Sequence, residues 1–395
     1  MYDCIIIGGG ISGISFACQL KKAGRKVLVL EKENEIGGQI RTCRSALYPD
    51  YWMELGSHTC YNTYVHLLSL VEDLKLGDEI LGLDRCAYKL FAGGEVKGVQ
   101  SEISFFSLFL HGPRLFFSSK AGKTVRDYFR PIVGATNYDH LFSKLFRAVI
   151  SQNADEYPAE IFLKRRKERR KEYPRKFSFK GGLLSFLRNI VEKGGLQVHT
   201  GTEVMEVAKE DGKYRISTSD GKVLESQAVA LATPAHITAG LIRSLEPAIA
   251  DYFRTIPPFH SETLDIIVKK DALTLPKLAG IIPVSDEFLS IVTRDVAEHP
   301  ELRSFTLHVE GQRTTEEEKR AILCRVLSLR PEDILESFST THSLPSLRLP
   351  HTPLLRKVEE LRTQEDLFLL GNYYYGLSLE DCVHRSSDEA KRFGA

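Results

Sequence analysis

The 395-residue sequence lacks several features that would assign a function at once. It contains no CxxC pair and no Cys/His cluster with the spacing of a zinc site, so we expect no metal centre. The seven cysteines are expected to be reduced thiols of a cytoplasmic protein, because no signal segment is predicted. Lys and Arg total 53 against 52 for Asp and Glu, and a net charge of +1 gives no reason to expect nucleic acid as a partner.

Long apolar runs are also absent. None reaches the roughly 18 to 20 residues that cross a bilayer. The nearest, "ISFFSLFLHGPRLFF" over 103–117, is interrupted by His111, Gly112, Pro113 and Arg114. The chain also lacks a Ser/His/Asp order and a paired-carboxylate signature, so no catalytic residue is assigned. We therefore expect the chemistry to come from a cofactor that the protein positions.

The first 31 residues contain a βαβ pattern. A β-branched run, "CIIIG", leads directly into Gly8-x-Gly10-x-x-Gly13, followed by helical apolar spacing and a second apolar run, "KVLVLE", that ends in Glu31. The glycines provide a tight turn, a close approach to a pyrophosphate and close packing of helix on strand. Ser12 lies at the helix start, where backbone amides favour an anion, and Glu31 lies where a ribose is held. This pattern predicts a dinucleotide-binding turn.

The next segment, "EIGGQIRT", distinguishes flavin from nicotinamide binding. It resembles the extended fingerprint of the flavin amine oxidase superfamily, and the order of Arg41 and Thr42 is similar to that of the FAD-dependent protoporphyrinogen and coproporphyrinogen oxidases. "YWMELGSHTCYN" (51–62) resembles the segment of that superfamily that lies beneath the flavin; a surface turn ahead of a helix is the open alternative. The C-terminal "LFLLGNYYYGLSLEDC" resembles the C-terminal signature of the porphyrinogen oxidases. The resemblance implies FAD contacts at Lys32, Gly37, Gly38, Arg41, Thr42, Gly56, Ser57, Val204, Ala232, Gly371, Asn372, Gly376, Leu377 and Ser378.

The resemblance also implies an architecture. We expect an α/β fold with a Rossmann-like FAD-binding domain, an interleaved α+β substrate domain and a helical insert, as in p-hydroxybenzoate hydroxylase and the amine oxidases. The predicted FAD domain comprises 1–60, 177–245 and 355–395, and the substrate domain 61–100 and 246–354. The insert spans 101–176. The three tyrosines after the last strand are expected to pack around its turn.

The activity implied by the resemblance is oxidation of a porphyrinogen to the porphyrin in haem biosynthesis. Hydride passes to the flavin, and because no second GxGxxG is present, oxygen or another acceptor is expected to reoxidise it. The substrate would be an anionic tetrapyrrole, with Arg85 placed to bind a propionate and Ile281 to press on the macrocycle; an ordinary surface charge is the alternative for Arg85. Another oxidase or desaturase acting on an amine, a polyene or a lipid-like molecule, and a redox-neutral sugar-nucleotide mutase, stay open. A homodimer also stays open.

Two segments of the insert have two interpretations each. The apolar run 103–117 either docks at the inner face of a membrane or packs inside the insert. The basic run "KRRKERRKEYPRK" (164–176) is either a solvated helix face with a linker, or a positive surface that attracts lipid or an anionic substrate.

Overall fold

The first sheet is built from the segments that the sequence predicts to bind a dinucleotide. The computed structural model describes residues 1–294, 298–311 and 314–395. Within them this sheet has the order β10-β2-β1-β13-β12-β11, with β19 beside the second half of β13. The strands β10, β2, β1, β13 and β19 run parallel, and β11 and β12 form an antiparallel hairpin. The bounds are β1 Tyr2–Ile7, β2 Val27–Leu30, β10 Val198–His199, β11 Val204–Glu210, β12 Lys213–Thr218, β13 Val223–Leu231 and β19 Leu367–Leu369.

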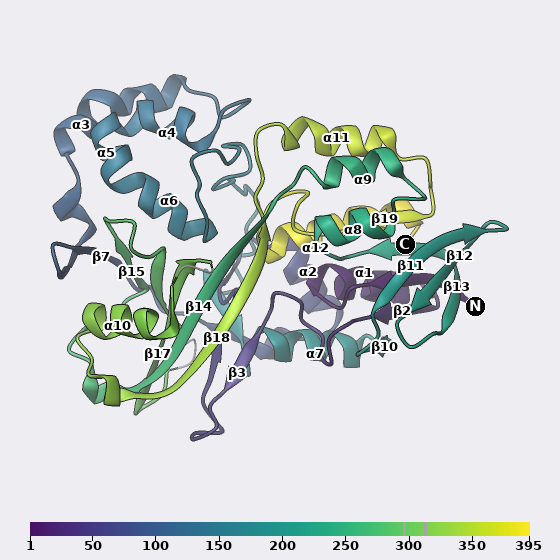
Figure 1. The fold of residues 1–395 in the computed structure, drawn as a ribbon, viewed down its shortest axis with the longest axis horizontal. Coiled ribbons are helices and arrows are strands. Elements are labelled where there is room, and N and C mark those ends of the chain that lie inside the picture. The colour runs from purple at the N-terminus through teal and green to yellow at the C-terminus, as the bar shows by residue number, and fades with distance from the viewer. Residues whose placement is uncertain (295–297, 312–313) are drawn as a thin grey trace.

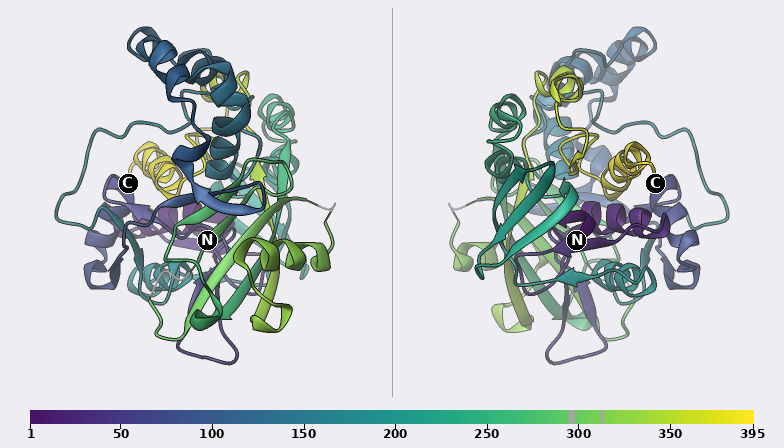
Figure 2. Two further views of the ribbon diagram at one scale, coloured as in Figure 1. Left: turned by 90° about the vertical axis from the view of Figure 1, so that its left-hand side faces the viewer. Right: turned by 90° about the vertical axis from the view of Figure 1, so that its right-hand side faces the viewer.

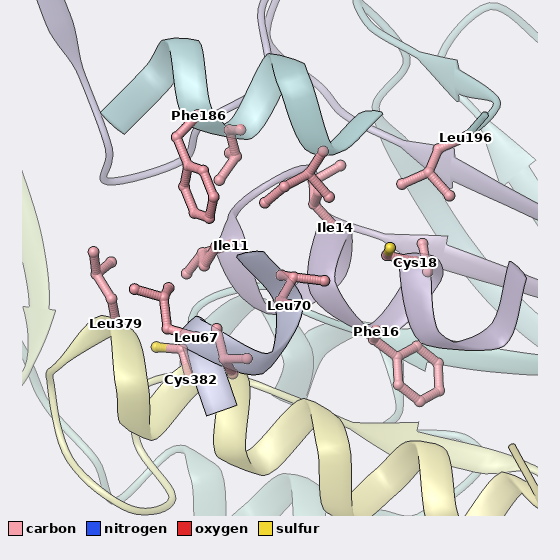
Figure 3. Close-up of a cluster of buried hydrophobic side chains, with 14 of the residues drawn as sticks. Ile11, Ile14, Phe16, Cys18, Leu67, Leu70, Phe186, Leu196, Leu379 and Cys382 are labelled. Carbon is pink, nitrogen blue, oxygen red and sulfur yellow. The ribbon is translucent and has the colours of Figure 1, made fainter. Parts of the chain in front are cut away.

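Helices cover both faces of this sheet, which explains why β1 and β2 read as continuous apolar runs. On one face α1 (Ile11–Lys22) packs with α2 (Val65–Asp73), α7 (Leu183–Lys193) and α12 (Leu379–Phe393), whose apolar side chains meet in Figure 3. On the other lie α8 (Ala235–Leu241), α9 (Pro247–Phe253) and α11 (His351–Leu361) (Figure 1). The site-bearing turns are therefore held by a core on each side.

The second sheet has the order β18-β14-β17-β16-β15-β7-β8. Its strands are antiparallel neighbours except for the parallel pair β7 and β15. Helix α10 (Glu316–Leu327) covers one face, and the long strands β14 and β18 run from this sheet toward the first one (Figure 1). The bounds are β7 Tyr88–Ala92, β8 Glu95–Gly98, β14 Pro258–Lys269, β15 Gly280–Pro283, β16 Ser290–Thr293, β17 Leu302–Glu310 and β18 Ile334–Pro345.

The helical insert projects from the rest of the molecule (Figures 1 and 2). It comprises α3 (Phe105–His111), α4 (Val125–Val133), α5 (Ala135–Asn137), a π-helical turn over Tyr138–Phe142 and α6 (Ser143–Ile150). Its buried aromatic side chains, among them Tyr138 and Phe146, belong to the same core as α8, α9 and α11. The insert is thus packed onto the helices that cover one face of the first sheet.

The basic run 164–176 differs from the predicted helix face. Residues 164–175 contain no helix and form an extended loop, the teal segment that bulges outward in both views of Figure 2, and β9 (Lys176–Phe179) begins at its end. Like charges three and four residues apart repel on a helix, and the loop is instead fixed by ion pairs of Arg166 and Arg170 to other elements. Strand β9 pairs with β5 (Cys60–Tyr61) and with β6 (Ile80–Gly82). A separate two-stranded sheet is formed by β3 (Thr42–Arg44) and β4 (Trp52–Glu54).

The structure divides two of the ranges predicted for the substrate domain. Within 61–100, α2 packs against α1 and α12 in the core of the first sheet, and β7 and β8 join the second. Within 246–354, α9 packs on the first sheet, whereas β14 to β18 form the second. The reason is that the apolar faces of α2 and α9 complete the covering of a sheet that needs both faces buried.

Candidate active site

The turn between β1 and α1 forms a cradle that requires glycine at two positions. A Cβ on Gly13 would lie 2.0 Å from the Gly8 carbonyl oxygen, and one on Gly8, whose φ is +110°, would lie 2.7 Å from the Ala232 oxygen. At Gly10 the nearest atom to an added Cβ is 3.8 Å away, so the backbone before α1 is open to a close approach. This geometry fits a diphosphate held on the first amides of α1, in which Ser12 lies.

Glu31 follows β2 and faces the same turn. Its Oε2 accepts a 2.7 Å hydrogen bond from the Gly9 N–H, and its Oε1 accepts one of 3.0 Å from Glu33. The chain leading to Val204 is adjacent, because the Thr202 N–H donates to the Glu31 carbonyl oxygen at 2.8 Å. Lys32 is exposed at the surface, where it pairs with Glu33 at 3.6 Å. The predicted residues Glu31 and Ala232 therefore contact the glycine turn, and Val204 follows two residues after Thr202.

The glycine pair Gly37 and Gly38 lies against this turn. The Gly37 N–H donates to the Gly9 oxygen at 3.0 Å, and a Cβ on Gly38 would lie 3.4 Å from the Gly10 Cα. Both glycines have positive φ, +135° and +60°, which side chains rarely adopt. Arg41 is exposed beyond the pair. Segments separated by nearly thirty residues thus form one glycine-lined surface.

Glu54 is a fully buried carboxylate next to this surface. It accepts hydrogen bonds from Thr42 Oγ1 at 2.9 Å and from the Leu183 N–H, at the start of α7, at 2.6 Å. Burial raises the pKa of Glu54 to about 7, and these two hydrogen bonds oppose the rise. Thr42 therefore serves as a structural link between β3, β4 and α7.

The C-terminal signature forms a second glycine turn between β19 and α12. Gly371 and Gly376 have φ values of +141° and +138°, and a Cβ on Gly376 would lie 2.8 Å from Asp381 Oδ2. Ser378 caps α12 by accepting the Asp381 N–H at 3.1 Å. Asn372, between β19 and this turn, is half-buried.

The tyrosines after β19 pack as predicted for two of the three positions. Tyr373 and Tyr374 are buried, and Tyr373 lies edge-on to Phe253 with ring centroids 5.2 Å apart. The Arg385 guanidinium lies 4.0 Å from the Tyr374 ring centroid. Tyr375 is half-buried and donates to Asp388 at 2.9 Å. These contacts hold the shape of the turn.

A cavity of about 550 Å³ lies between the two sheets and the insert. Seven of its lining residues come from the segments predicted to lie at the FAD: Gln39, Gly56, Ser57, His58, Thr59, Tyr61 and Leu377. The end of α6 forms another wall through Ala148, Val149 and Ile150. The remaining wall comes from the second sheet, chiefly from Ser261, Ser290, Val292, Thr293, Arg294, His308, His342 and Leu344.

Arg294 is the centre of a buried polar network in this cavity, and the sequence did not indicate it. It is 3% exposed and donates through Nη1 to the Gly56 oxygen at 2.7 Å and to His58 Nδ1. It also donates through Nη2 to His308 Nε2 at 3.1 Å. Burial and the nearby guanidinium lower the pKa of both histidines well below the ordinary value, so each is a neutral acceptor toward Arg294.

The two residues predicted to contact substrate do not line this cavity. Ile281 pairs with Ile291 across β15 and β16, and both are fully buried in the core beneath α10. Because side chains alternate along a strand, the cavity face is formed instead by Val292, one position along from Ile291. Arg85 is exposed between Asp84 and Cys86, both of which line the cavity. Burial in that core contradicts the prediction for Ile281, whereas a propionate contact by the exposed Arg85 side chain stays a prediction.

The charge of the lining is positive. Its described residues include three cations, Lys176, Lys277 and Arg294, and one carboxylate, Asp84. Asp84 pairs with Lys277 at 2.8 Å. No carboxylate forms an ion pair with Lys176 in the described part of the chain, which leaves this ammonium group available to a bound anion.

Comparison with known proteins agrees with this geometry. Residues 11–268 match the family "Flavin containing amine oxidoreductase". A probable flavin-containing monoamine oxidase A of Dictyostelium discoideum is 36% identical over 74 residues, 19% of this chain and 16% of that protein. A 15-cis-phytoene desaturase of Capsicum annuum is 22% identical over 277 residues, 60% of this chain and 47% of that one. The matches thus span less than half the length of these relatives.

The fold has a counterpart in a solved structure. A protein of Exiguobacterium sp. 255-15, provisionally named a protoporphyrinogen oxidase, superposes with a TM-score of 0.80 over 99% of both chains at 16% identity. This likeness confirms the predicted α/β architecture. With the glycine cradles fitting a dinucleotide, and with the family match covering more than half of the sequence, the chain belongs to the flavin-containing amine oxidoreductases and its cofactor is FAD.

Proposed function

We propose that this protein oxidises a porphyrinogen, protoporphyrinogen IX or coproporphyrinogen III, to the porphyrin. The observation that favours this substrate class is the positive lining of the cavity, with Lys176 free of a carboxylate among the described residues. Such a substrate is apolar in its middle and anionic at its propionates, and the cavity offers Leu83, Leu278 and Leu377 beside the cation. FAD, when bound, supplies the hydride acceptor, and oxygen is the proposed final acceptor.

The residues of the chain have distinct roles in this proposal. Lys176 binds a propionate as a point charge. Arg294 holds the Gly56 carbonyl and the His58 ring in place, so that the segment beside the flavin keeps its shape. The first amides of α12, capped by Ser378, provide positive potential where negative charge develops on reduction.

Amine oxidation is the first alternative, and the family name supports it. Lys176, Tyr61 and Tyr88 line the cavity, and a lysine or paired aromatic rings near the flavin would suit that reaction. The charge opposes it, because two like charges 4 Å apart repel by about 1 to 4 kcal/mol in a solvated site. A protonated amine would therefore enter this cavity less readily than a carboxylate. A desaturase of an uncharged polyene would use the leucines but leave Lys176 unpaired.

The test uses the purified flavoprotein without oxygen. Protoporphyrinogen, coproporphyrinogen, putrescine and phytoene are added separately, and bleaching of the flavin absorbance is followed; air is then admitted and porphyrin fluorescence recorded. We expect bleaching with a porphyrinogen and fluorescence above the non-enzymatic rate. Bleaching by the amine or the polyene alone, or by none of them as for a redox-neutral mutase, would overturn the proposal.

Two matched variants locate the anion site. Lys176→Ala is expected to raise KM for the porphyrinogen about tenfold, equivalent to about 1.4 kcal/mol, with a smaller effect on kcat. Arg85→Ala removes an exposed charge outside the lining and is expected to leave KM within a factor of two. A larger rise in KM for Arg85→Ala than for Lys176→Ala would show that the propionate does not bind at Lys176.

We also propose that the insert docks on an anionic bilayer. In 103–117 Ile103 and Leu108 pack partly against the core, but seven large side chains do not: Phe105, Phe106, Phe109, Leu110, Leu115, Phe116 and Phe117 are between 51% and 90% exposed. We call these seven residues the apolar patch. It lies on α3 and the turn that follows, at the outer side of the insert (Figure 1). None of the described helices is long and apolar enough to cross a bilayer, so contact would be peripheral.

Charge around the apolar patch favours lipid over a second copy of the chain. The range 103–117 contains no acidic residue, Arg114 lies within it, and Lys120 and Lys123 follow it. Lys120 donates to the Phe162 and Leu163 carbonyl oxygens, which places the start of the basic loop beside these cations. Exposed apolar side chains with cations nearby suit an anionic membrane surface.

Vesicle sedimentation tests the docking. We expect binding to vesicles containing phosphatidylserine, and its loss in Phe106→Glu/Phe109→Glu/Phe116→Glu, whereas Met205→Glu, at an exposed methionine on β11, binds as the parent does. Equal binding by the triple variant would refute the proposal. A patch-dependent homodimer in light scattering, without vesicle binding, would assign the surface to self-association instead.

A further inference from the structure

Arg166, in the basic loop, contacts the start of α12, which faces the cavity. Arg166 donates from Nη2 to Ser378 Oγ at 2.8 Å and to Asp381 Oδ1 at 3.0 Å. Its guanidinium also lies 5.0 Å from the centroid of the Tyr64 ring. Arg165 and Lys167, on either side, are exposed, so Arg166 is the member of this part of the run that turns inward.

The contact with Arg166 compensates the negative charge of Asp381. Its side chain is 9% exposed, and its second oxygen, Oδ2, accepts from Ser378 Oγ at 2.6 Å. Among the described residues, Arg166 is the cation in ion-pair contact with it. A buried carboxylate that loses its only cation keeps the cost of desolvation without the compensating attraction.

The pair lies within one helical turn of the cavity. Leu377, directly before the cap residue Ser378, lines the cavity, and so does Leu163, three residues before Arg166. An added Cβ on Gly376 would lie 2.8 Å from Asp381 Oδ2, so the carboxylate touches the glycine turn assigned to the flavin end of the cofactor. Arg166 therefore joins two walls of the cavity and neutralises a charge between them.

We propose that Arg166 is a positioning residue for the flavin: it fastens the basic loop to the start of α12 and cancels the negative charge of Asp381 beside the reduced ring. This inference rests on the placement of the flavin end of FAD at the α12 start. Reduction adds negative charge to the flavin, so an uncompensated carboxylate nearby disfavours the reduced form, and an uncompensated guanidinium favours it.

The experiment measures the midpoint potential of bound FAD against a reference dye, for the parent and for three variants. Arg166→Ala is expected to lower the potential and Asp381→Asn to raise it. The double variant, Arg166→Ala/Asp381→Asn, is expected to return close to the parent. A tenfold change in the ratio of binding constants for reduced and oxidised FAD corresponds to about 30 mV for a two-electron couple, which is readily measured.

Controls separate charge from folding. Arg165→Ala removes an adjacent exposed cation and is expected to leave the potential unchanged, and Arg166→Lys is expected to keep most of the parent value because it keeps the charge. Shifts of the same sign in both single variants, or a lower melting temperature with no shift in either, would overturn the proposal. Because no substrate is used, failure to oxidise a porphyrinogen leaves this test unaffected. If Arg166→Ala does not retain FAD, the sign of the shift in midpoint potential of Asp381→Asn still tests the proposal.

Discussion

Replacing Glu54 with glutamine should change how stability depends on pH. Glu54 is 0% exposed and burial raises its pKa to about 7, against an ordinary value of 4.5. Below pH 4.5 the carboxyl is protonated in both the folded and the unfolded chain, and its contribution to stability is fully present. As pH rises toward 7 the unfolded chain loses this proton first, so the contribution is lost. At 1.36 kcal/mol per pH unit, the loss between pH 5 and pH 8 is between about 2 and 3 kcal/mol.

Glutamine has no proton to lose in this range and keeps an oxygen for the Leu183 N–H. Urea unfolding of the parent and of Glu54→Gln, with FAD in excess at pH 5, 6, 7 and 8, gives the difference in free energy of unfolding at each pH. We expect the free energy of unfolding of Glu54→Gln to rise relative to that of the parent by about 2 to 3 kcal/mol between pH 5 and pH 8. Thr42→Val removes a hydrogen bond that lowers the Glu54 pKa, so in this variant the loss should extend to higher pH. A difference that stays constant from pH 5 to pH 8 would refute the reasoning.

Three further substitutions and one control, Gly24→Ala, test the packing around the predicted site. Gly13→Ala places a Cβ 2.0 Å from the oxygen of the turn's first glycine and should abolish FAD retention, whereas Gly24→Ala, with φ +79° and no atom within 4 Å, should cost about 1 kcal/mol and keep the flavin absorbance per mole of protein. Arg385→Met leaves the buried Glu389 with one cation fewer and should lower the free energy of unfolding by about 3 kcal/mol in urea; a loss below 1 kcal/mol would contradict this. Tyr374→Phe removes a buried hydroxyl that has no hydrogen-bond partner among the described residues, and should leave kcat and the melting temperature within error of the parent or raise the latter.

The sequence predicted the glycine turns of the first sheet for a physical reason. Gly13 and Gly37 have steric requirements that are visible locally, since each sits in a short strand–turn–helix or loop pattern where a side chain would clash with a residue three to five positions away. Ser378 followed by an acidic turn likewise predicts the start of α12 from four adjacent residues. Motifs of this kind need no knowledge of distant contacts.

The substrate side could not be predicted in the same way. The resemblance places Ile281 against the substrate, but which face of β15 meets the cavity depends on its register with β16, which the strand itself does not encode. Arg85 was assigned from its position before a hairpin, and its neighbours Asp84 and Cys86 face the cavity instead. In both cases the local element was right and the direction of the side chain was not determined by the sequence pattern.

Arg294 and Arg166 explain why the decisive polar contacts escape a reading along the chain. Each is an unremarkable arginine in sequence, and each acquires its role from residues more than two hundred positions away: Gly56 and His58 for Arg294, and Ser378 and Asp381 for Arg166. Such contacts lie where two separately folded surfaces meet, so no period or spacing within one segment reports them. A guanidinium that lies inside the protein has to satisfy its donors, and here the acceptors lie at Gly56 and His58 and at the start of α12, segments that we propose to flank the flavin. The shape and charge of the cavity are therefore set by the meeting of the two sheets and the loop, and variants of these two arginines should alter the flavin environment more than variants of any residue within a single strand of the second sheet.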